Sequence, residues 1–246
     1  MTGTSAAMPE TDAISLRVTP YGEADLIVTF LAAEGGKVRG IARAARRSRK
    51  RFGAGLDPGN RGLLSHHTQG RSELVTVDGF AGARPPDLGP DPVTGFAVIH
   101  VALEACDVLS VEGENANRRF RILVELLGLV GAGAEPQTAL AWFLATVLAD
   151  AGFAPRFDAC VRCGSALGAQ ARFDAARAAV VCARCSSDAS VASIEPGLAA
   201  RIAALRPDGR DLETARSAVE LLGAALEHLA GRRLRALEFL RATGPG

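Results

Sequence analysis

Residues 13–80 alternate apolar and polar side chains in short runs, which is typical of half-buried β-strands. The apolar members of the two clearest runs are Ile14, Leu16, Val18, Leu26, Val28 and Phe30. The turn-forming sequences PYGEAD and AEGGK separate these runs, and shorter runs follow at 62–66 and 74–80. About five strands in this space predict a small β-barrel, with an OB-fold as the first choice and an SH3-like barrel as the alternative.

A stretch rich in proline and glycine, ARPPDLGPDP, follows at residues 83–92. Helices and sheet interiors do not accept such a sequence, so we predict a linker there. The expected organisation is a tail at 1–12, a barrel at 13–82 and a second domain at 93–246.

Beyond the linker the apolar spacing becomes helical. The segments RRFRILVELLGLV and EPQTALAWFLATVLADAG follow this period, the second with an early proline and a terminal glycine. Two further stripes consist of Phe96, Ile99, Leu103 and Cys106, and of Leu212, Ala215, Val219, Leu222, Leu226 and Leu229. We interpret these stripes as the ordinary core of an all-α domain, in which Cys106 is a small buried apolar residue.

The chain of 246 residues has a formal net charge of only +1, yet residues 36–53 concentrate positive charge without a single acid. The cations of this run are Lys37, Arg39, Arg43, Arg46, Arg47, Arg49, Lys50 and Arg51. Glycines at both ends predict a bent, accessible segment. The run indicates either binding to a polyanion or a solvated charged loop, and charge alone does not choose between them.

The N-terminal sequence MTGTSAAMPETDA has neither the basic nor the apolar region of a secretory signal. The longest apolar run, ALAWFLATVLA, is about half of the roughly 20 residues that a membrane crossing needs. We therefore expect a cytoplasmic protein without membrane contact, whose thiols stay reduced.

Four of the five cysteines follow the spacing C-x2-C-x18-C-x2-C: Cys160, Cys163, Cys182 and Cys185. Two such turns close a tetrahedron of thiolates around zinc and leave no position for water, so we predict one structural zinc per chain. Disulfides are disfavoured by the reducing compartment, and a thioredoxin-like motif needs one pair rather than two.

The common catalytic motifs are missing from the sequence, including the phosphate-binding loop, the nucleophile elbow and the zinc-protease helix. His100 begins HVA, which fails the zinc-deaminase signature H-x-E. The four histidines show no carboxylate or serine partner at a telling spacing. We therefore expect a protein that is not an enzyme.

The predicted layout is an α+β multidomain protein, with a small N-terminal β-barrel of the OB-fold type followed by an all-α domain. A zinc ribbon with four cysteine ligands is inserted in the second domain at about 157–190. A barrel with a cationic run and a zinc ribbon is typical of nucleic-acid-binding proteins. The sequences PYGEADLIVTFL, GGKVRGIARAARRSRKRF and LADAGFAPRFDACVRCG resemble the RecO family of bacterial recombination mediators and DNA repair proteins, over roughly residues 13–190.

This resemblance implies binding of single- and double-stranded DNA and annealing of strands coated by single-strand-binding protein. It also implies that RecA loading is assisted together with RecR. The cationic run of the barrel would contact DNA, and the four cysteines would hold zinc. One departure is that Ala178 and Ala179 stand where the family usually shows paired glycines.

The barrel region has few aromatic residues that could stack on bases: Tyr21, Phe30, Phe52 and Phe80. We expect two of them to face inward, so that arginines on phosphates, rather than base stacking, provide the binding. The cations would screen the repulsion between two strands. The alternatives are a zinc-ribbon transcription factor or adaptor that reads duplex DNA or binds an acidic protein, and a nuclease, whose magnesium-binding carboxylates are not evident.

Overall fold

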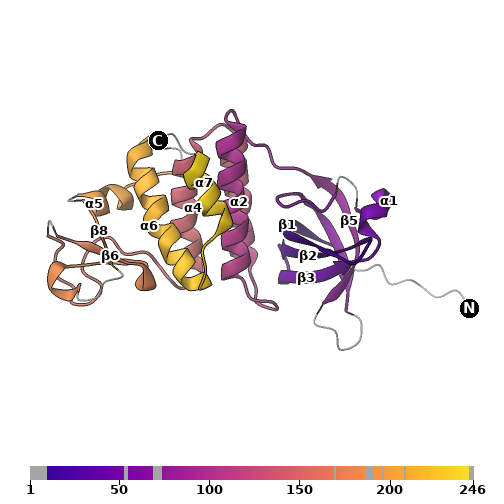
Figure 1. Ribbon diagram of the computed structural model, residues 1–246, viewed down its shortest axis with the longest axis horizontal. Helices are drawn as coiled ribbons and strands as arrows, with labels where there is room; N and C mark the ends of the chain where they lie inside the picture. Colours follow the sequence, from indigo (N-terminus) through magenta and orange to yellow (C-terminus); the bar gives the residue numbers. More distant parts are fainter. Residues whose placement is uncertain are drawn as a thin grey trace, which may run out of the picture. The chain divides into compact units, whose positions relative to one another are not determined.

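The computed structural model of the protein describes most of the chain (Figure 1). The described residues are 10–52, 55–68, 74–168, 170–186, 191–195, 197–207 and 209–243, without the side chains of Arg49, Lys50, Val191 and Ala192. The chain divides into two compact units. The barrel unit consists of Met1–Pro86 and Ser110–Arg121, and the helical unit of Asp87–Leu109 and Ile122–Gly246.

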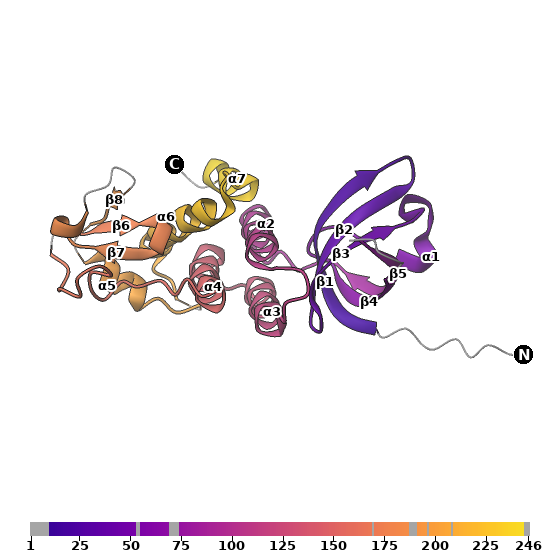
Figure 2. The same ribbon diagram turned by 90° about the horizontal axis from the view of Figure 1, so that it is seen from below.

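Five strands form the closed barrel, in the order β1-β2-β3-β5-β4 (Figures 1 and 2). They are β1 (Glu10–Tyr21), β2 (Asp25–Ala32), β3 (Gly36–Ala42), β4 (Arg61–His67) and β5 (Val75–Arg84). Strand β1 pairs with both β2 and β4, while β3 and β5 close the barrel as its parallel pair. This topology is that of an OB-fold. It confirms the predicted fold class and excludes the SH3-like alternative.

The barrel core follows the apolar alternation of the sequence. Val28 and Phe30 on β2, Leu64 on β4 and Phe80 on β5 are all fully buried and belong to one cluster. The rings of Phe30 and Phe80 lie 5.1 Å apart, centroid to centroid. The strands extend slightly beyond residues 13–82, since β1 begins at Glu10 and β5 ends at Arg84.

The segment Ser110–Arg121 belongs to the barrel unit, although it follows the first long helix in the sequence. Glu112 forms isolated β-bridges with Gly36 and Lys37, and the Asn117 amide donates a hydrogen bond of 3.0 Å to the Ala33 carbonyl. Gly36 has a φ of +69°, and a Cβ there would lie 1.9 Å from the Glu114 carbonyl oxygen. Glycine is therefore required at this close approach of two backbones.

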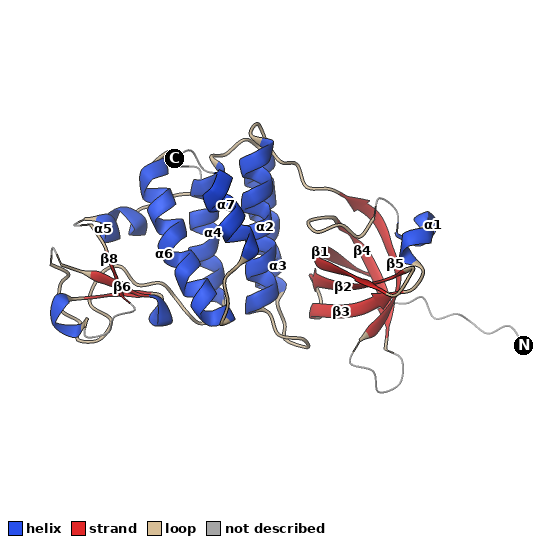
Figure 3. Cartoon of the chain, viewed as in Figure 1, coloured by secondary structure: helices blue, strands red, loops and turns tan. Residues whose placement is uncertain are grey.

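Helices form most of the helical unit (Figure 3). They are α2 (Pro92–Leu109), α4 (Pro136–Asp150), α5 (Leu198–Ala203), α6 (Leu212–Ala230) and α7 (Arg235–Thr243), while α3 (Asn117–Gly131) begins in the barrel unit and continues here. Within the described residues, α2 alone has the length and apolar composition of a membrane span, and half of it is buried. It packs against α4, α6 and α7, and Cys106 on it is fully buried, as predicted.

A small ribbon is inserted between α4 and α5 of the helical unit. Its three-stranded sheet has the order β7-β6-β8, from β6 (Arg172–Asp174), β7 (Ala179–Val181) and β8 (Val191–Ser193). Short 3-10 turns follow β6 and β7 at Ala175–Arg177 and Ala183–Cys185. Residues 187–190, at the end of the predicted ribbon, lie outside the described part of the chain.

Candidate nucleic-acid interface and metal centre

The cationic run leaves the barrel at the end of β3 and turns through η1 (Ala45–Arg47) into the single turn α1 (Arg49–Phe52). Its backbone is fastened to the hairpin between β1 and β2. The Ala44 amide donates to Asp25 Oδ1 at 2.7 Å, and the Arg46 amide donates to the Ala24 carbonyl at 3.1 Å. We call residues 43–48 the arginine loop. This loop is bent and its arginines are exposed, whereas the first part of the predicted bent segment, Gly36–Ala42, is the regular strand β3.

The arginines of this loop and Arg51 of the following turn α1 differ in how they are held. Arg43, Arg46 and Arg47 are exposed, and Arg46 Nη1 lies 3.5 Å from the Glu23 carbonyl. Arg51 folds back instead, because its guanidinium donates to the Arg43 carbonyl at 2.5 Å and to Ser48 Oγ at 3.2 Å. Arg51 thus connects the two ends of the loop, at Arg43 and Ser48, and stabilises its conformation.

Arg49 and Lys50 lie in α1, and their side chains are not among those that the structure describes. The two remaining cations lie on β3 rather than in the loop. Lys37 lies at the start of the strand beside Glu112, about 20 Å of strand from Arg43. Arg39 lies between them, exposed on the outward face. The run is therefore distributed along the barrel instead of forming a single patch.

The strand register adds Arg17, an exposed arginine outside the run. Arg17 on β1 pairs with Thr29 on β2, and Thr29 pairs with Arg39 on β3. Residues directly opposite each other in a sheet lie on the same face, so the two arginines form one row with Thr29 between them. A single arginine in a strand carries no sequence signal, and only the register reveals this row.

The aromatic residues of the barrel are more buried than expected. Phe30, Phe52 and Phe80 are all inside, and Tyr21 alone is exposed, with 54% of its surface accessible. Of these four aromatic residues, Tyr21 is therefore the one whose ring is accessible to a base.

The sequence analysis found no carboxylate partner for any histidine, and the structure of the barrel shows one. His67 on β4 has a carboxylate partner, since its Nδ1 lies 2.8 Å from Oδ2 of Asp78 on the neighbouring strand β5. The pair is invisible in the sequence because only the strand register brings it together. Burial lowers the pKa of the adjacent His66. The contact explains how a half-exposed histidine is held, and a His–Asp pair alone performs no reaction.

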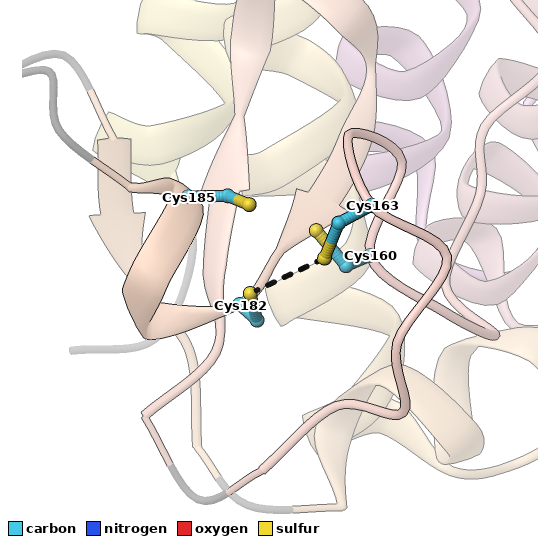
Figure 4. A group of neighbouring side chains, drawn as sticks. All are labelled: Cys160, Cys163, Cys182 and Cys185. Atoms are coloured by element: carbon cyan, nitrogen blue, oxygen red, sulfur yellow. Dashed lines mark hydrogen bonds between the residues drawn. The ribbon is translucent and has the colours of Figure 1, made fainter.

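The four cysteines of the ribbon meet at one point (Figure 4). All four sulfur atoms lie within 4.8 Å of one another, and those of Cys163 and Cys182 are 3.8 Å apart. Metal–sulfur bonds of about 2.3 Å in a tetrahedron put sulfurs about 3.8 Å apart. The cluster therefore fits a tetrahedral, four-thiolate metal ion.

Tight backbone turns aim these thiols. In the first turn the Gly164 amide donates to the Cys160 carbonyl at 2.8 Å, with Gly164 at a φ of +70°. In the second turn the Cys185 amide donates to the Cys182 carbonyl at 3.0 Å. Cys160 and Cys182 are buried, with Val181 packed against them. Glycine suits the left-handed turn, which explains its place directly after the first pair.

The pKa values of Cys160 and Cys185 depart from the ordinary thiol value in opposite directions. A hydrogen bond from the backbone of Cys182 is the main cause that lowers the pKa of Cys160 to about 6. Hydrogen bonds with Cys163 and then Cys182 raise the pKa of Cys185 to about 12. Four neighbouring thiols cannot all ionise by themselves because the thiolates repel one another. A bound divalent cation removes this conflict, since thiolates are its ligands.

One arginine between the first two cysteines connects the halves of the ribbon. Arg162 Nη1 donates to the Cys185 carbonyl at 2.9 Å, and Arg162 Nη2 lies 3.4 Å from Asp174 Oδ2. Arg177 Nη1 binds the same carboxylate oxygen at 2.7 Å. The Asp174 side chain is only 8% exposed, so the two arginines compensate a nearly buried charge.

The paired alanines before the second cysteine pair occupy a demanding turn. Ala178 has a φ of +48°, in the left-handed region that favours glycine, while Ala179 begins strand β7. The departure from paired glycines thus costs backbone strain at Ala178. It does not move the cysteines away from their common centre.

An OB-fold barrel followed by helices and a ribbon with four clustered cysteines defines a class of modular, multidomain protein. Two family models match the chain, described as recombination protein O N terminal over residues 8–84 and recombination protein O C terminal over residues 94–238. The chain belongs to the RecO family.

Relatives with similarity along nearly the whole chain agree with this assignment. The DNA repair protein RecO of Anaeromyxobacter sp. (strain K) is 38% identical over 251 residues, which cover 94% of this chain and 95% of the relative. The DNA repair protein RecO of Myxococcus xanthus is 33% identical over 243 residues, covering 95% and 97%. The corresponding protein of Thermobifida fusca is 32% identical over 225 residues, covering 89% and 90%. The resemblance of the sequence motifs is thereby confirmed.

Proposed function

We propose that the protein is a cytoplasmic, non-enzymatic mediator of DNA repair and recombination, which binds single- and double-stranded DNA without reading its sequence. It anneals complementary strands coated by single-strand-binding protein and, with RecR, helps RecA to load. The arginine loop on the OB-fold barrel carries this proposal, because Arg43, Arg46 and Arg47 are exposed while the loop backbone is held in place. The family membership supports it.

The chemistry of the exposed side chains favours phosphates over bases. Arginine binds phosphate with planar, bidentate contacts that carry no direct sequence information. Three of the four aromatic residues of the barrel are buried, so the bases of a bound strand stay largely free to pair. The repulsion between two polyanionic strands opposes their annealing. Cations in the loop and in the Arg17–Arg39 row would reduce that repulsion on both strands.

The four-cysteine centre has a structural role in this proposal. Cys160, Cys163, Cys182 and Cys185 would hold one zinc ion, the divalent ion that tetrahedral thiolate sites prefer. Four protein ligands complete the coordination and leave no position for an activated water. The ion would therefore close the ribbon and stabilise the helical unit around it.

The decisive experiment is the annealing of complementary oligonucleotides coated with single-strand-binding protein, with and without this chain. We expect faster annealing in its presence, and equal rates would contradict the proposal. RecR and RecA are added in a second stage, where faster RecA filament formation is expected only when this chain and RecR are both present.

Salt dependence tests the electrostatic mechanism itself. If Arg39, Arg43, Arg46 and Arg47 each contact one phosphate, the slope of log affinity against log salt on single strands should be about −2.8, from roughly −0.7 per contact. All eight cations of the run would give about −5.6. Oligonucleotides of equal length and different sequence should bind within a few-fold of one another.

A zinc-ribbon transcription factor that reads duplex DNA stays the alternative. Readers of this kind place a helix in the major groove. Between the two cysteine pairs, the described residues form β6, a 3-10 turn and β7 instead. A preference of about a thousandfold for one duplex would support the alternative and overturn the proposal above.

A further inference from the structure

Tyr21 is the only tyrosine in the chain and the last residue of β1. Single apolar side chains are common on protein surfaces, so its exposure alone indicates no function. Its surroundings in the barrel are what make this residue informative.

The strand register places Tyr21 on the face that carries the arginine loop. Tyr21 pairs directly with Asp25 on β2, so the two side chains lie on the same face, with Cβ atoms about 5 Å apart. The Asp25 carboxylate in turn accepts the hydrogen bond from the Ala44 amide of the loop. Arg46 reaches the Glu23 carbonyl of the same hairpin. The aromatic ring is therefore a neighbour of the loop.

Cations lie on the other side of Tyr21 as well. Arg17 is four residues earlier on β1, on the same outward face and about 13 Å away along the strand. It is level with Arg39 on β3, through Thr29. The exposed ring therefore lies between the arginine loop and the Arg17–Arg39 row. OB-folds bind oligonucleotides over this same face and the loop between the first two strands.

We propose that Tyr21 is a base-stacking position for single-stranded DNA, with the phosphates on either side bound by the arginine loop and the Arg17–Arg39 row. The inference rests on the proposed DNA binding and adds a contact that depends on an unpaired base. One stacked base positions the strand on the barrel. The bases on either side stay free to pair, as annealing requires.

The test compares two probes of equal length and charge, a thymidine oligonucleotide and an oligomer of abasic sites. Both offer the same phosphates, and only the first offers bases. The wild-type chain should bind the thymidine oligonucleotide about 5- to 150-fold more tightly, the range for one base stacked on an aromatic ring. Tyr21→Ala should remove this preference without changing the affinity for the abasic oligomer.

Two variants separate stacking from simple packing. Tyr21→Phe keeps the aromatic face and should keep the preference within about twofold, whereas Tyr21→Leu keeps apolar bulk and should lose it. Leu63→Ala is the matched control, since Leu63 is an exposed apolar residue of the same barrel on β4, 45% accessible. This control should bind both probes like the wild type.

The outcomes distinguish this inference from the function on which it rests. Equal binding of both probes by the wild type, or a preference that survives both Tyr21→Ala and Tyr21→Leu, overturns the stacking role and leaves electrostatic DNA binding intact. Failure of the wild type to bind either probe overturns both. Thermal unfolding of each variant, expected to be unchanged, shows that altered affinity does not come from a damaged barrel.

Discussion

The arginine loop and the four-cysteine ribbon are both built on tight turns, but they hold their functional side chains in opposite ways. In the ribbon the thiols converge, Cys160 and Cys182 are buried, and Arg162 connects the two turns. In the loop the backbone is fastened, while the side chains of Arg46 and Arg47 are exposed, and that of Arg46 makes a long contact of 3.5 Å with the Glu23 carbonyl. The ribbon should therefore respond to mutation through stability and the loop through affinity.

The largest effect is expected in the ribbon. Cys160→Ser or Cys185→Ser removes one of four ligands, and metal binding is worth on the order of 10 kcal/mol in small zinc modules. The variants should lose their metal and unfold locally at 157–186, as measured by metal analysis and hydrogen exchange.

Cys106→Ala is the matched control, because Cys106 is buried on α2 outside the cluster. It should keep about one zinc per chain. A Cys160→Ser variant that retained the metal and an intact ribbon would contradict the structural role of the centre.

The next effect is on DNA binding by the loop. Arg46→Glu combined with Arg47→Glu should weaken binding to single strands more than about tenfold, because two phosphate contacts become repulsions. The thermal midpoint should not change, since exposed charges contribute little to folding. Fluorescence anisotropy and calorimetry measure the two quantities.

Arg206→Glu combined with Arg210→Glu changes the charge equally on exposed positions of the helical unit, between α5 and α6. This control should bind nearly as the wild type does. If both double variants lost the same affinity, the effect would belong to net charge and not to the loop.

A smaller effect should separate the two contacts of Arg162. Arg162→Ala loses the hydrogen bond to the Cys185 carbonyl, and outer contacts of this kind change metal affinity by about 10- to 100-fold. Arg177→Ala loses only its contact with Asp174 and should keep the metal affinity. Competition with a chelator provides the measurement. Equal losses in both variants would assign the effect to the Asp174 ion pairs.

The smallest effect is expected on the free energy of unfolding, when backbone strain is relieved in each of the two regions. Ala44 in the loop and Ala178 in the ribbon both have positive φ, at 51° and 48°. Ala44→Gly should raise the free energy of unfolding by about 1 kcal/mol, because glycine adopts this conformation without a steric penalty. Ala178→Gly should raise the free energy of unfolding by less, since it also removes a buried methyl group. Denaturant titration would reveal any reversal of this order.

Local patterns identified much of the molecule in advance. Alternating apolar residues predicted the barrel core around Val28 and Phe30, and helical stripes predicted α2, α4 and α6. The short helices α5 and α7 were not predicted. The place of Ser110–Arg121 in the barrel unit was not predicted either, because its contacts with Ala33 and Gly36 join residues far apart in the chain.

The sequence by itself determined which residues can do chemistry here. Two cysteine pairs at this spacing imply a shared centre, since each short turn has room to aim two sulfurs at one point. It also determined which side chains of the strands lie in the core, because a period of two assigns each side chain to the core or to the surface, whereas the strand order that makes the barrel an OB-fold came from the tertiary structure. The tertiary structure alone decided how the cations are distributed: Lys37 lies beside Glu112, Arg51 supports the loop, and Arg17 joins Arg39 in one row. The physical reason is that charge has no period of its own, so a charged side chain goes wherever strand pairing and long-range hydrogen bonds place its backbone.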